Sequence, residues 1–424
     1  MIETIQTTRL GNGMTVLTEH MPGLRSVTAC VWIRRGARYE SAELNGIYHF
    51  IEHMVFRGTR RRTALQISVE SDRLGGRLDA FTSHEMTGFT VKTVDAALPR
   101  ALDLLMDMVT APRFDAGDLE SERQVIFEEI NSILDTPDKL LARLFNTSCF
   151  PSHPLGRPIE GTPATISRFS CEQLALFHAA EYVPRNIVVT AAGNLEHGRL
   201  VELAERACAT HSNSAAAGGA DVAPPARAAP LLIEPREDLE QAHLMIAAPW
   251  PSSLSEDRFA AMLLAAVMGG GSSGRLWQSL REERGITSSV DVFARTFSDV
   301  GVFTIYATVS PPFVDETIDL TLTELRRVVR EPVSAAELRL AKDRLISSVL
   351  LALESTDARA GKLARQEIIH GRLILPDEAI EKIERVTLSD LQRLAVASFQ
   401  TEKLGAAILG NVNGLRLDRG RLEV

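Results

Sequence analysis

The stretch HSNSAAAGGADVAPPARAA, residues 211–229, divides the chain near its midpoint. It is rich in small residues, glycine and proline, and it has no hydrophobic periodicity, which is typical of a connector between domains. The chain has 424 residues, so the lengths on the two sides of this stretch are about equal. The sequence therefore predicts an N-terminal domain over 1–210, a linker over 211–229 and a C-terminal domain over 230–424.

The segment before the linker predicts an α+β domain. Two alternating runs flank Asn12-Gly13 and indicate a hairpin, because this dipeptide favours a tight turn between strands. Elsewhere, alternating apolar runs predict strands, and apolar residues at helical spacing predict helices. The expected strands are 7–10, 14–20, 26–35, 78–84, 87–94 and 186–194, and the expected helices are 44–57, 63–74, 96–110, 117–133, 137–147, 171–181 and 196–209.

The segment after the linker repeats this order of elements. The expected strands are 230–235, 241–248, 287–297, 301–309 and 403–411, and the expected helical stretches are 256–268, 274–284 and 313–398. The two halves also close on similar strand ends, AAGN at 191–194 and ILGN at 408–411. The sequence therefore predicts the α+β class with two tandem copies of one unit, each a mostly antiparallel sheet with helices packed on one side.

Composition limits the classes of partner. The chain has 46 basic and 55 acidic residues and a net charge of −9, which argues against nucleic acid or an anionic membrane as the main partner and suits basic peptides. Its four cysteines are scattered and form no CxxC pair, which fits a reducing compartment. We see no signal peptide and no apolar run of about 18 residues, so the sequence predicts a cytoplasmic protein.

The sharpest chemical signal is the stretch GIYHFIEHMVFRGT, residues 46–59, on a predicted helix. His49 and His53 are four residues apart, so both project from one face and can reach one metal ion. Glu52 is next to His53 and one turn from His49, close enough to reach a water on that metal. The order HxxEH reverses the HExxH zinc signature. The alternative interpretation is an amphipathic helix whose histidines only form hydrogen bonds.

A third protein ligand is expected, because catalytic zinc usually has three and keeps one position open. The best candidate region is the acidic helix DLESERQVIFEEINSIL, residues 118–134. Glu122 and Glu129 are seven residues apart and share a face, whereas Glu128 points about 100° away from it. We choose Glu129 as the ligand and Glu122 as a carboxylate that orients a histidine. Without HxxEH, a solvated acidic face would be the better interpretation.

The combination of HxxEH and, 76 residues after His53, Glu129 in an E-x6-E helix resembles the pitrilysin family of zinc peptidases, the inverzincins. Other stretches are similar to family members: GGRLDAFTSHEMTGFTV (75–91), HPLGRPIEGT (153–162), YVPRNIVVTAAGN (182–194) and MGGGSSGRLWQSLREERGI (268–286). The resemblance covers nearly the whole chain. It is strongest to bacterial relatives of mitochondrial processing peptidase, whose chains pair as dimers that enclose a chamber.

The resemblance implies a zinc endopeptidase that acts on peptides or unfolded segments. His49, His53 and Glu129 would bind Zn2+, and Glu52 would be the general base. Zinc would polarise the scissile carbonyl and lower the pKa of its water toward neutrality. Glu52 would take the proton of that water and pass it to the leaving amine.

The resemblance also implies a strand that binds substrate. Asp79, Ala80, Phe81 and Thr82 would pair with an extended substrate backbone, a mode of binding that reads little sequence and favours unfolded peptides. The family more often has Asn at the position of Asp79. A carboxylate cannot donate the hydrogen bonds of an amide.

A second departure concerns the C-terminal half. The family usually supplies an Arg from this half and a Tyr seven residues later, and both stabilise the substrate and its oxyanion. Arg281 matches the Arg, but the position of the Tyr is Ser288. Either a homodimer manages without the Tyr, or this chain is the zinc-bearing subunit of a heterodimer and a paralogous partner supplies Arg and Tyr. We favour the heterodimer.

Two other classes of function are weighed against a peptidase. One is a scaffold subunit of the same fold without catalysis, as in respiratory-complex core subunits, which typically lose the zinc residues. The other is a different HxxEH zinc enzyme, such as the lyase that cleaves S-ribosylhomocysteine, which is much shorter and has no duplicated half. The intact zinc residues argue against the scaffold, and the repeat argues against the lyase.

Overall fold

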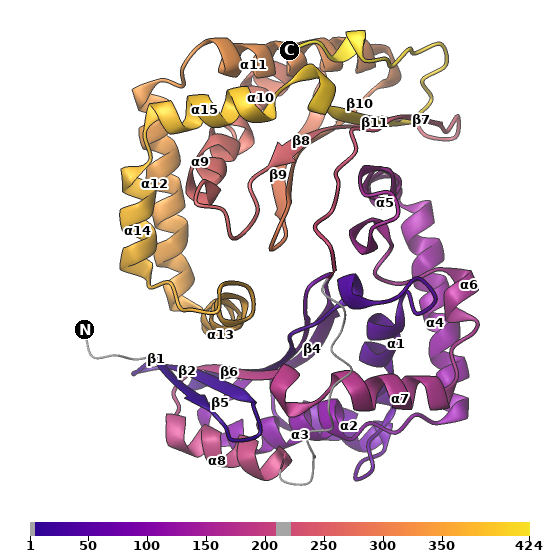
Figure 1. The fold of residues 1–424 in the computed structure, drawn as a ribbon, viewed down its shortest axis with the longest axis vertical. Coiled ribbons are helices and arrows are strands. Elements are labelled where there is room, and N and C mark those ends of the chain that lie inside the picture. The colour runs from indigo at the N-terminus through magenta and orange to yellow at the C-terminus, as the bar shows by residue number, and fades with distance from the viewer. Residues whose placement is uncertain (1–4, 209–221) are drawn as a thin grey trace. The chain divides into compact units, whose positions relative to one another are not determined.

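The computed structural model describes residues 5–208 and 222–424 and divides into two compact units (Figure 1). Unit 1 comprises Met1–Asn131, Arg157–Ala223 and Leu351–Leu373. Unit 2 comprises Ser132–Gly156, Pro224–Leu350 and Ile374–Val424. Residues 211–221 of the predicted linker lie outside the described residues.

Unit 1 is built on a six-stranded sheet. Its strands are β1 (Ile5–Arg9), β2 (Thr15–His20), β3 (Ser26–Ile33), β4 (Arg77–Thr82), β5 (Thr87–Val94) and β6 (Ile187–Gly193), in the order β1-β2-β6-β3-β5-β4. Only the β2–β6 pair is parallel. The strand β4 therefore ends the sheet on one side.

Most helices of unit 1 cover one face of this sheet. They are α1 (Ile47–Met54), α2 (Ala64–Arg73), α3 (Leu98–Thr110), most of α4 (Ala116–Asp135), α6 (Pro163–Ile166), α7 (Cys171–Glu181) and α8 (His197–Cys208). Side chains alternate along a strand, so Val31 and Ile33 of β3 pack into the core with these helices, and Trp32 points to the other face. Apolar burial on the helix-bearing face is what fixes the helices to the sheet.

Unit 2 repeats the topology of unit 1. Its strands are β7 (Leu231–Pro235), β8 (Ala242–Trp250), β9 (Thr287–Thr296), β10 (Gly301–Val309) and β11 (Gly405–Gly410), in the order β7-β11-β8-β10-β9. This is the order β2-β6-β3-β5-β4 of unit 1, again with one parallel pair, β7–β11. The predicted duplication and the α+β class are confirmed.

The helices of unit 2 surround a second core. They are α5 (Pro137–Cys149), α9 (Arg258–Gly269), α10 (Arg275–Trp277), α11 (Val314–Arg330), α12 (Ala335–Leu351), α14 (Pro376–Arg385) and α15 (Leu388–Ser398). The helical stretch predicted over 313–398 is thus several helices. One of them, α13 (Thr356–Arg365), belongs to unit 1.

Two helices lie outside the predicted domain boundaries, because each belongs to the unit that the other half of the chain mainly forms. The N-terminal half contributes α5 to unit 2, where Phe145 packs with Met245 and Ala247. The C-terminal half contributes α13 to unit 1 (Figure 1). There Leu363 packs with Trp32 and other residues on the second face of the sheet. The expectation of helices on one side is therefore incomplete. Each sheet has apolar side chains on both faces, and the exchanged helix covers the second one.

Polar contacts reinforce the position of α13 on unit 1. Asp357 accepts hydrogen bonds from Thr28 Oγ1 at 2.7 Å and from Lys92 Nζ at 2.8 Å, and Arg359 pairs with Glu19 of β2.

No helix among the described residues is long and apolar enough to cross a membrane.

Candidate metal centre

The helix α1 presents one buried face and one functional face. Ile47, Phe50, Ile51 and Met54 have no exposed surface and anchor the helix in the core of unit 1. This leaves the face with His49 and His53 directed away from the main core. The centroids of the two imidazole rings lie 4.7 Å apart. The four-residue spacing places both histidines side by side, as the sequence predicts.

Glu129 of α4 joins this pair. Its Oε2 lies 3.5 Å from His49 Nε2 and 3.6 Å from His53 Nε2. One ligand atom from each of the three residues lies within 4.8 Å of the others, and the described residues contain no other such group of three or more.

The donor set and its spacing fit a zinc ion. Zinc in proteins takes imidazole nitrogen and carboxylate oxygen at about 2.0–2.2 Å, and tetrahedral geometry then separates the ligand atoms by about 3.3–3.6 Å. The distances from Glu129 Oε2 to the two imidazole nitrogens agree with this value. Three protein ligands also leave the fourth position open, as a catalytic site requires.

Glu122 holds the second histidine. Its Oε2 lies 2.9 Å from His53 Nδ1, and its other carboxylate oxygen pairs with Arg57. Burial acts to raise the pKa of the Glu122 carboxyl, but the bonds to His53 and Arg57 hold it below its usual value. A carboxylate on Nδ1 fixes the ring so that Nε2 faces the position of the metal.

The two histidines differ in their surroundings. Burial acts to lower the pKa of His53, but its bonds to Glu122 and Glu129 raise it to about 9. Burial and the neighbouring charge of His53 lower the pKa of His49. Moreover, His49 Nδ1 is buried and has no hydrogen-bond partner among the described residues. His53 is therefore held by a partner, whereas His49 depends on its helix.

Glu52 lies outside the ligand group and contacts the edge strand. Thr82 Oγ1 donates a hydrogen bond to Glu52 Oε2 at 2.6 Å. Burial raises the pKa of the Glu52 carboxyl, and the bond from Thr82 opposes this effect. The arrangement gives a carboxylate of raised basicity beside the metal ligands, which is suited to accepting a proton.

The strand β4 ends the sheet of unit 1, and its residues have different surroundings. Ser83 N–H donates to Met86 O at 2.9 Å, so the backbone groups of Ser83 face β5. Along an antiparallel strand, the residues whose backbone groups face the neighbouring strand alternate with those whose groups face away from it. The backbone groups of Ala80 and Thr82 therefore face the open edge of β4. Asp79 pairs with Arg77 at 2.6 Å, and its Oδ1 also accepts from Ala80 N–H at 3.1 Å.

Phe81 has a packing role in this strand. Its ring meets Trp32 edge to face, with 5.5 Å between the ring centroids. Of the four residues predicted to bind substrate, Thr82 is the one whose side chain bonds to Glu52.

Arg281 belongs to unit 2, in a stretch of π-helix from Gln278 to Glu283. Its guanidinium lies 4.4 Å from the ring centroid of Trp277 and donates to the backbone oxygen of Ser288. These contacts hold the side chain in unit 2. The structure thus brings together His49, Glu52, His53, Thr82, Glu122 and Glu129 within unit 1 and places Arg281 in the other unit.

Sequence reasoning missed two residues near this cluster. Arg57, which pairs with Glu122, lies four residues after His53, and this spacing on a helix could have indicated it. Glu40, whose carboxylate contacts the start of α1, gives no such signal, because its role depends on how the preceding loop folds back.

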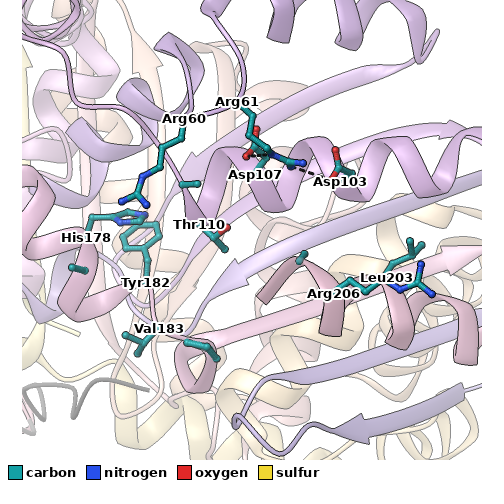
Figure 2. Close-up of a pocket in the computed structure, with 14 residues that line it drawn as sticks. Arg60, Arg61, Asp103, Asp107, Thr110, His178, Tyr182, Val183, Leu203 and Arg206 are labelled. Carbon is teal, nitrogen blue, oxygen red and sulfur yellow. Dashed lines mark hydrogen bonds and ion pairs between the residues drawn. The ribbon is translucent and has the colours of Figure 1, made fainter. Parts of the chain in front are cut away.

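One cavity of unit 1 is a separate feature from this cluster. Its volume is about 790 Å³, and α3, α7 and α8 contribute to its lining (Figure 2). Asp107 in its wall accepts from Arg61 at 2.8 Å and from Arg62 at 2.7 Å, and Asp103 binds the same two arginines. None of the cluster residues lines this cavity, and its carboxylates serve to hold the loop after α1 against α3.

Comparisons with known proteins agree with the duplicated fold. A family model described as "Insulinase (Peptidase family M16)" matches residues 15–163, and one described as "Peptidase M16 inactive domain" matches residues 168–345. An uncharacterized zinc protease of Mycobacterium leprae is 34% identical over 409 residues, which cover 95% of this chain and 91% of that protein.

Two solved structures share the fold over nearly the whole chain. A protease from Helicobacter pylori has a TM-score of 0.89 at 21% identity and covers 96% of this chain and 99% of its own. A structure from Pseudomonas fluorescens, described as a peptidase M16 inactive domain, has a TM-score of 0.89 at 20% identity, with 98% and 100% covered.

Proposed function

The chain belongs to the insulinase family, peptidase family M16, and we propose that it is a zinc-dependent endopeptidase acting on peptides or unfolded segments. The observation that carries the proposal is the meeting of His49, His53 and Glu129 around one position, with Glu52 beside them. The name of the Mycobacterium leprae relative as a zinc protease supports the choice of metal.

Each residue of the cluster has a task in this proposal. His49, His53 and Glu129 would hold the ion, and Glu122 would keep the ring of His53 in the required tautomer. Zinc bound there supplies Lewis acidity, which polarises a carbonyl and makes a water molecule acidic near neutral pH.

Glu52 would carry the proton in the hydrolysis. Its carboxylate accepts the proton of the attacking water and later delivers it to the nitrogen of the leaving amine, so the base is restored at the end of the cycle. The bond from Thr82 fixes the orientation of this carboxylate toward β4. The open edge of β4 would take up the extended backbone of the substrate by β-augmentation.

Asp79 modifies this edge. Its Oδ1 accepts the hydrogen bond of Ala80 N–H, a donor that an incoming substrate carbonyl would otherwise use. Substrate binding at this register would therefore displace the Asp79 side chain. This gives the substitution of Asp for the usual Asn a physical consequence.

We propose further that the active form is a heterodimer. Arg281 is present, but Ser288 replaces the Tyr of the family, and its hydroxyl is too short to reach across a chamber. A paralogous partner of similar size would supply the Arg and Tyr pair. Affinity purification from the native host should recover such a paralogue, and recovery of a pure homodimer would contradict the heterodimer.

A scaffold function is the second candidate. It is favoured by Ser288 and by the description of the model that matches 168–345 as an inactive domain. That description covers the half without HxxEH, and the complete ligand group in unit 1 favours the peptidase. The cytoplasmic location expected from the sequence stays a prediction.

The test is cleavage of a quenched, unstructured basic peptide by the zinc-loaded protein, alone and with its co-purified partner. Chelator should abolish cleavage, and Glu52→Gln should lower kcat by about 10²–10⁴-fold while zinc stays bound, because only the proton carrier is lost. Absence of cleavage in every combination, with no metal bound, would establish the scaffold.

A further inference from the structure

Glu40 is a buried carboxylate at the start of the metal-binding helix. It lies in the loop before α1 and is 4% exposed. Its Oε2 accepts from Gly46 N–H at 2.8 Å and from Asn45 Nδ2 at 3.2 Å, and its Oε1 accepts from Tyr48 N–H at 3.0 Å. Both oxygens therefore act as acceptors toward one end of α1.

These contacts replace an ordinary helix cap. The first N–H groups of a helix have no acceptor within the helix, and a Ser, Thr, Asp or Asn at the N-cap usually serves them. Here the N-cap is Gly46, with φ of 96°, and it offers no side chain. A Cβ at this position would lie 2.7 Å from the Cα of Gly161, so the packing excludes a side chain there. The cap has to come from another segment.

The capped turn contains a proposed metal ligand. The helix α1 has 8 residues, and a helix of about two turns is marginal without support from its surroundings. His49 is its third residue and therefore lies in the first turn. His53 lies in the second turn and has Glu122 as a partner, whereas His49 Nδ1 has none among the described residues. Fraying of the first turn would displace His49 and leave His53 in place.

We propose that Glu40 is a positioning residue that holds His49 for zinc by capping the first turn of α1. This inference rests on the proposed function, because it assigns His49 to the metal. Glu40 acts through the backbone of α1 and does not touch the ligand atoms.

Burial opposes the charged form of the Glu40 carboxyl, and its hydrogen bonds favour that form. Burial raises the pKa of its carboxyl to about 7, although the bonds from Gly46, Tyr48 and Asn45 oppose this. A charged group in such a place destabilises the fold unless it is fully compensated. A neutral amide has one acceptor oxygen, whereas the two carboxylate oxygens of Glu40 accept from Gly46 N–H and Tyr48 N–H at the same time and so hold both ends of the first turn.

The test compares Glu40→Gln with Glu43→Gln in the full chain. Gln has one acceptor oxygen, so its amide group would face an N–H of α1, whereas Glu43 is exposed in the same loop and its change removes the same charge. We expect Glu40→Gln to weaken zinc binding by tenfold or more in chelator competition, within the range of about 10–100-fold known for residues behind metal ligands. Glu43→Gln should match the wild type.

Two further readouts separate positioning from general destabilisation. The visible absorption of the cobalt-substituted protein reports the ligand geometry, and it should change in Glu40→Gln and stay unchanged in Glu43→Gln. In the unmutated, zinc-free protein, the amides of Gly46 and Tyr48 should be protected from hydrogen exchange, because Glu40 holds them before any metal binds. This measurement decides the inference even if Glu40→Gln does not fold.

A zinc affinity within twofold of the wild type and an unchanged cobalt spectrum in Glu40→Gln would overturn the inference. Rapid exchange of the Gly46 and Tyr48 amides without zinc would overturn it as well. Failure of the proposed function has another signature: the unmutated chain would bind neither zinc nor cobalt at one ion per chain, while the protection of these amides would be retained.

Discussion

The helices α1 and α9 occupy the same place in two units of the same topology. Each follows the equivalent strand of its sheet, β3 between β6 and β5 in unit 1 and β8 between β11 and β10 in unit 2. The sequence of α1 is IYHFIEHM, and that of α9 is RFAAMLLAAVMG, which has no His, Cys, Asp or Glu. The fold alone therefore does not provide the proposed metal ligands. The site needs one helix face with ligand residues and a second helix that supplies Glu129.

The two helices also differ in how they are held. In α9, residues such as Leu263, Leu264 and Met268 are buried, and apolar packing fixes the helix although no side chain caps its N-terminus. In α1, one face carries the proposed metal ligands, and Glu40 accepts hydrogen bonds from the first turn. A functional helix loses part of its apolar contact and needs polar support in its place.

The largest effect should come from breaking the ligand group in unit 1 only. His53→Ala removes one of three ligands, so the protein should lose its bound zinc and all peptidase activity, as metal analysis and a peptide assay would show. Met262→Gln on the exposed side of α9 is the matched control in unit 2 and should change neither. Loss of zinc in both variants would mean that the metal does not bind at α1.

The exchanged helices give the next largest effect. Leu363 of α13 and Phe145 of α5 are buried, so Leu363→Ala should lower the free energy of unfolding by about 2–5 kcal/mol and Phe145→Ala by about 3–5 kcal/mol. Denaturant unfolding measures both. Leu351→Ala, at a site with 66% exposure, is the control and should have little effect. A small change in either helix variant would show that the exchanged helix is not part of that core.

Glu122→Gln tests whether His53 depends on its hydrogen-bond partner, which His49 Nδ1 lacks among the described residues. Gln keeps the shape of Glu122 but not the charge that faces His53 and Arg57, so zinc affinity should fall by about 10–100-fold. Glu120→Gln, at an exposed site on the same helix, should leave the affinity unchanged. Chelator competition measures both variants. Equal affinities would mean that Glu122 does not orient the ring of His53.

The smallest effect is a pH dependence of stability in unit 2. The hydrogen bond from Arg275 lowers the pKa of Glu337 to about 2, with help from Ser334. A carboxyl whose pKa is lowered on folding stabilises the protein above its unfolded pKa of about 4.5, and this contribution is lost as the pH falls toward 2. Glu337→Gln should therefore be less stable than the wild type near neutral pH, and the difference should shrink toward pH 2.

Denaturant unfolding at several pH values tests this expectation, with the exposed Glu331→Gln as the control. Zinc affinity should be the same in Glu337→Gln and in the wild type, because the Arg275–Glu337 pair lies in unit 2. A constant stability difference between pH 2 and pH 7 would show that the ion pair does not account for the lowered pKa.

Much of the fold could be predicted because each element has a local pattern. The hairpin at Asn12-Gly13, the helix α7 and the strand β10 were all predicted within about two residues of their observed ends. The seven-residue spacing in α4 predicted that Glu122 shares a face with Glu129 and orients a histidine, and the structure identifies this histidine as His53. The exchange of α5 and α13 could not be predicted, because an amphipathic helix shows that it covers an apolar face but not which sheet provides that face.

The sequence by itself determined the duplicated α+β units, the HxxEH helix and the choice of Glu129, because local spacing decides which side chains share a face. Only the tertiary structure decided the helix exchange, the bond from Thr82 to Glu52 and the cap by Glu40. In each of these cases, residues from different elements of the fold meet through packing or through hydrogen bonds that involve a side chain. Such contacts depend on how the chain closes on itself, and no periodicity along the chain records them.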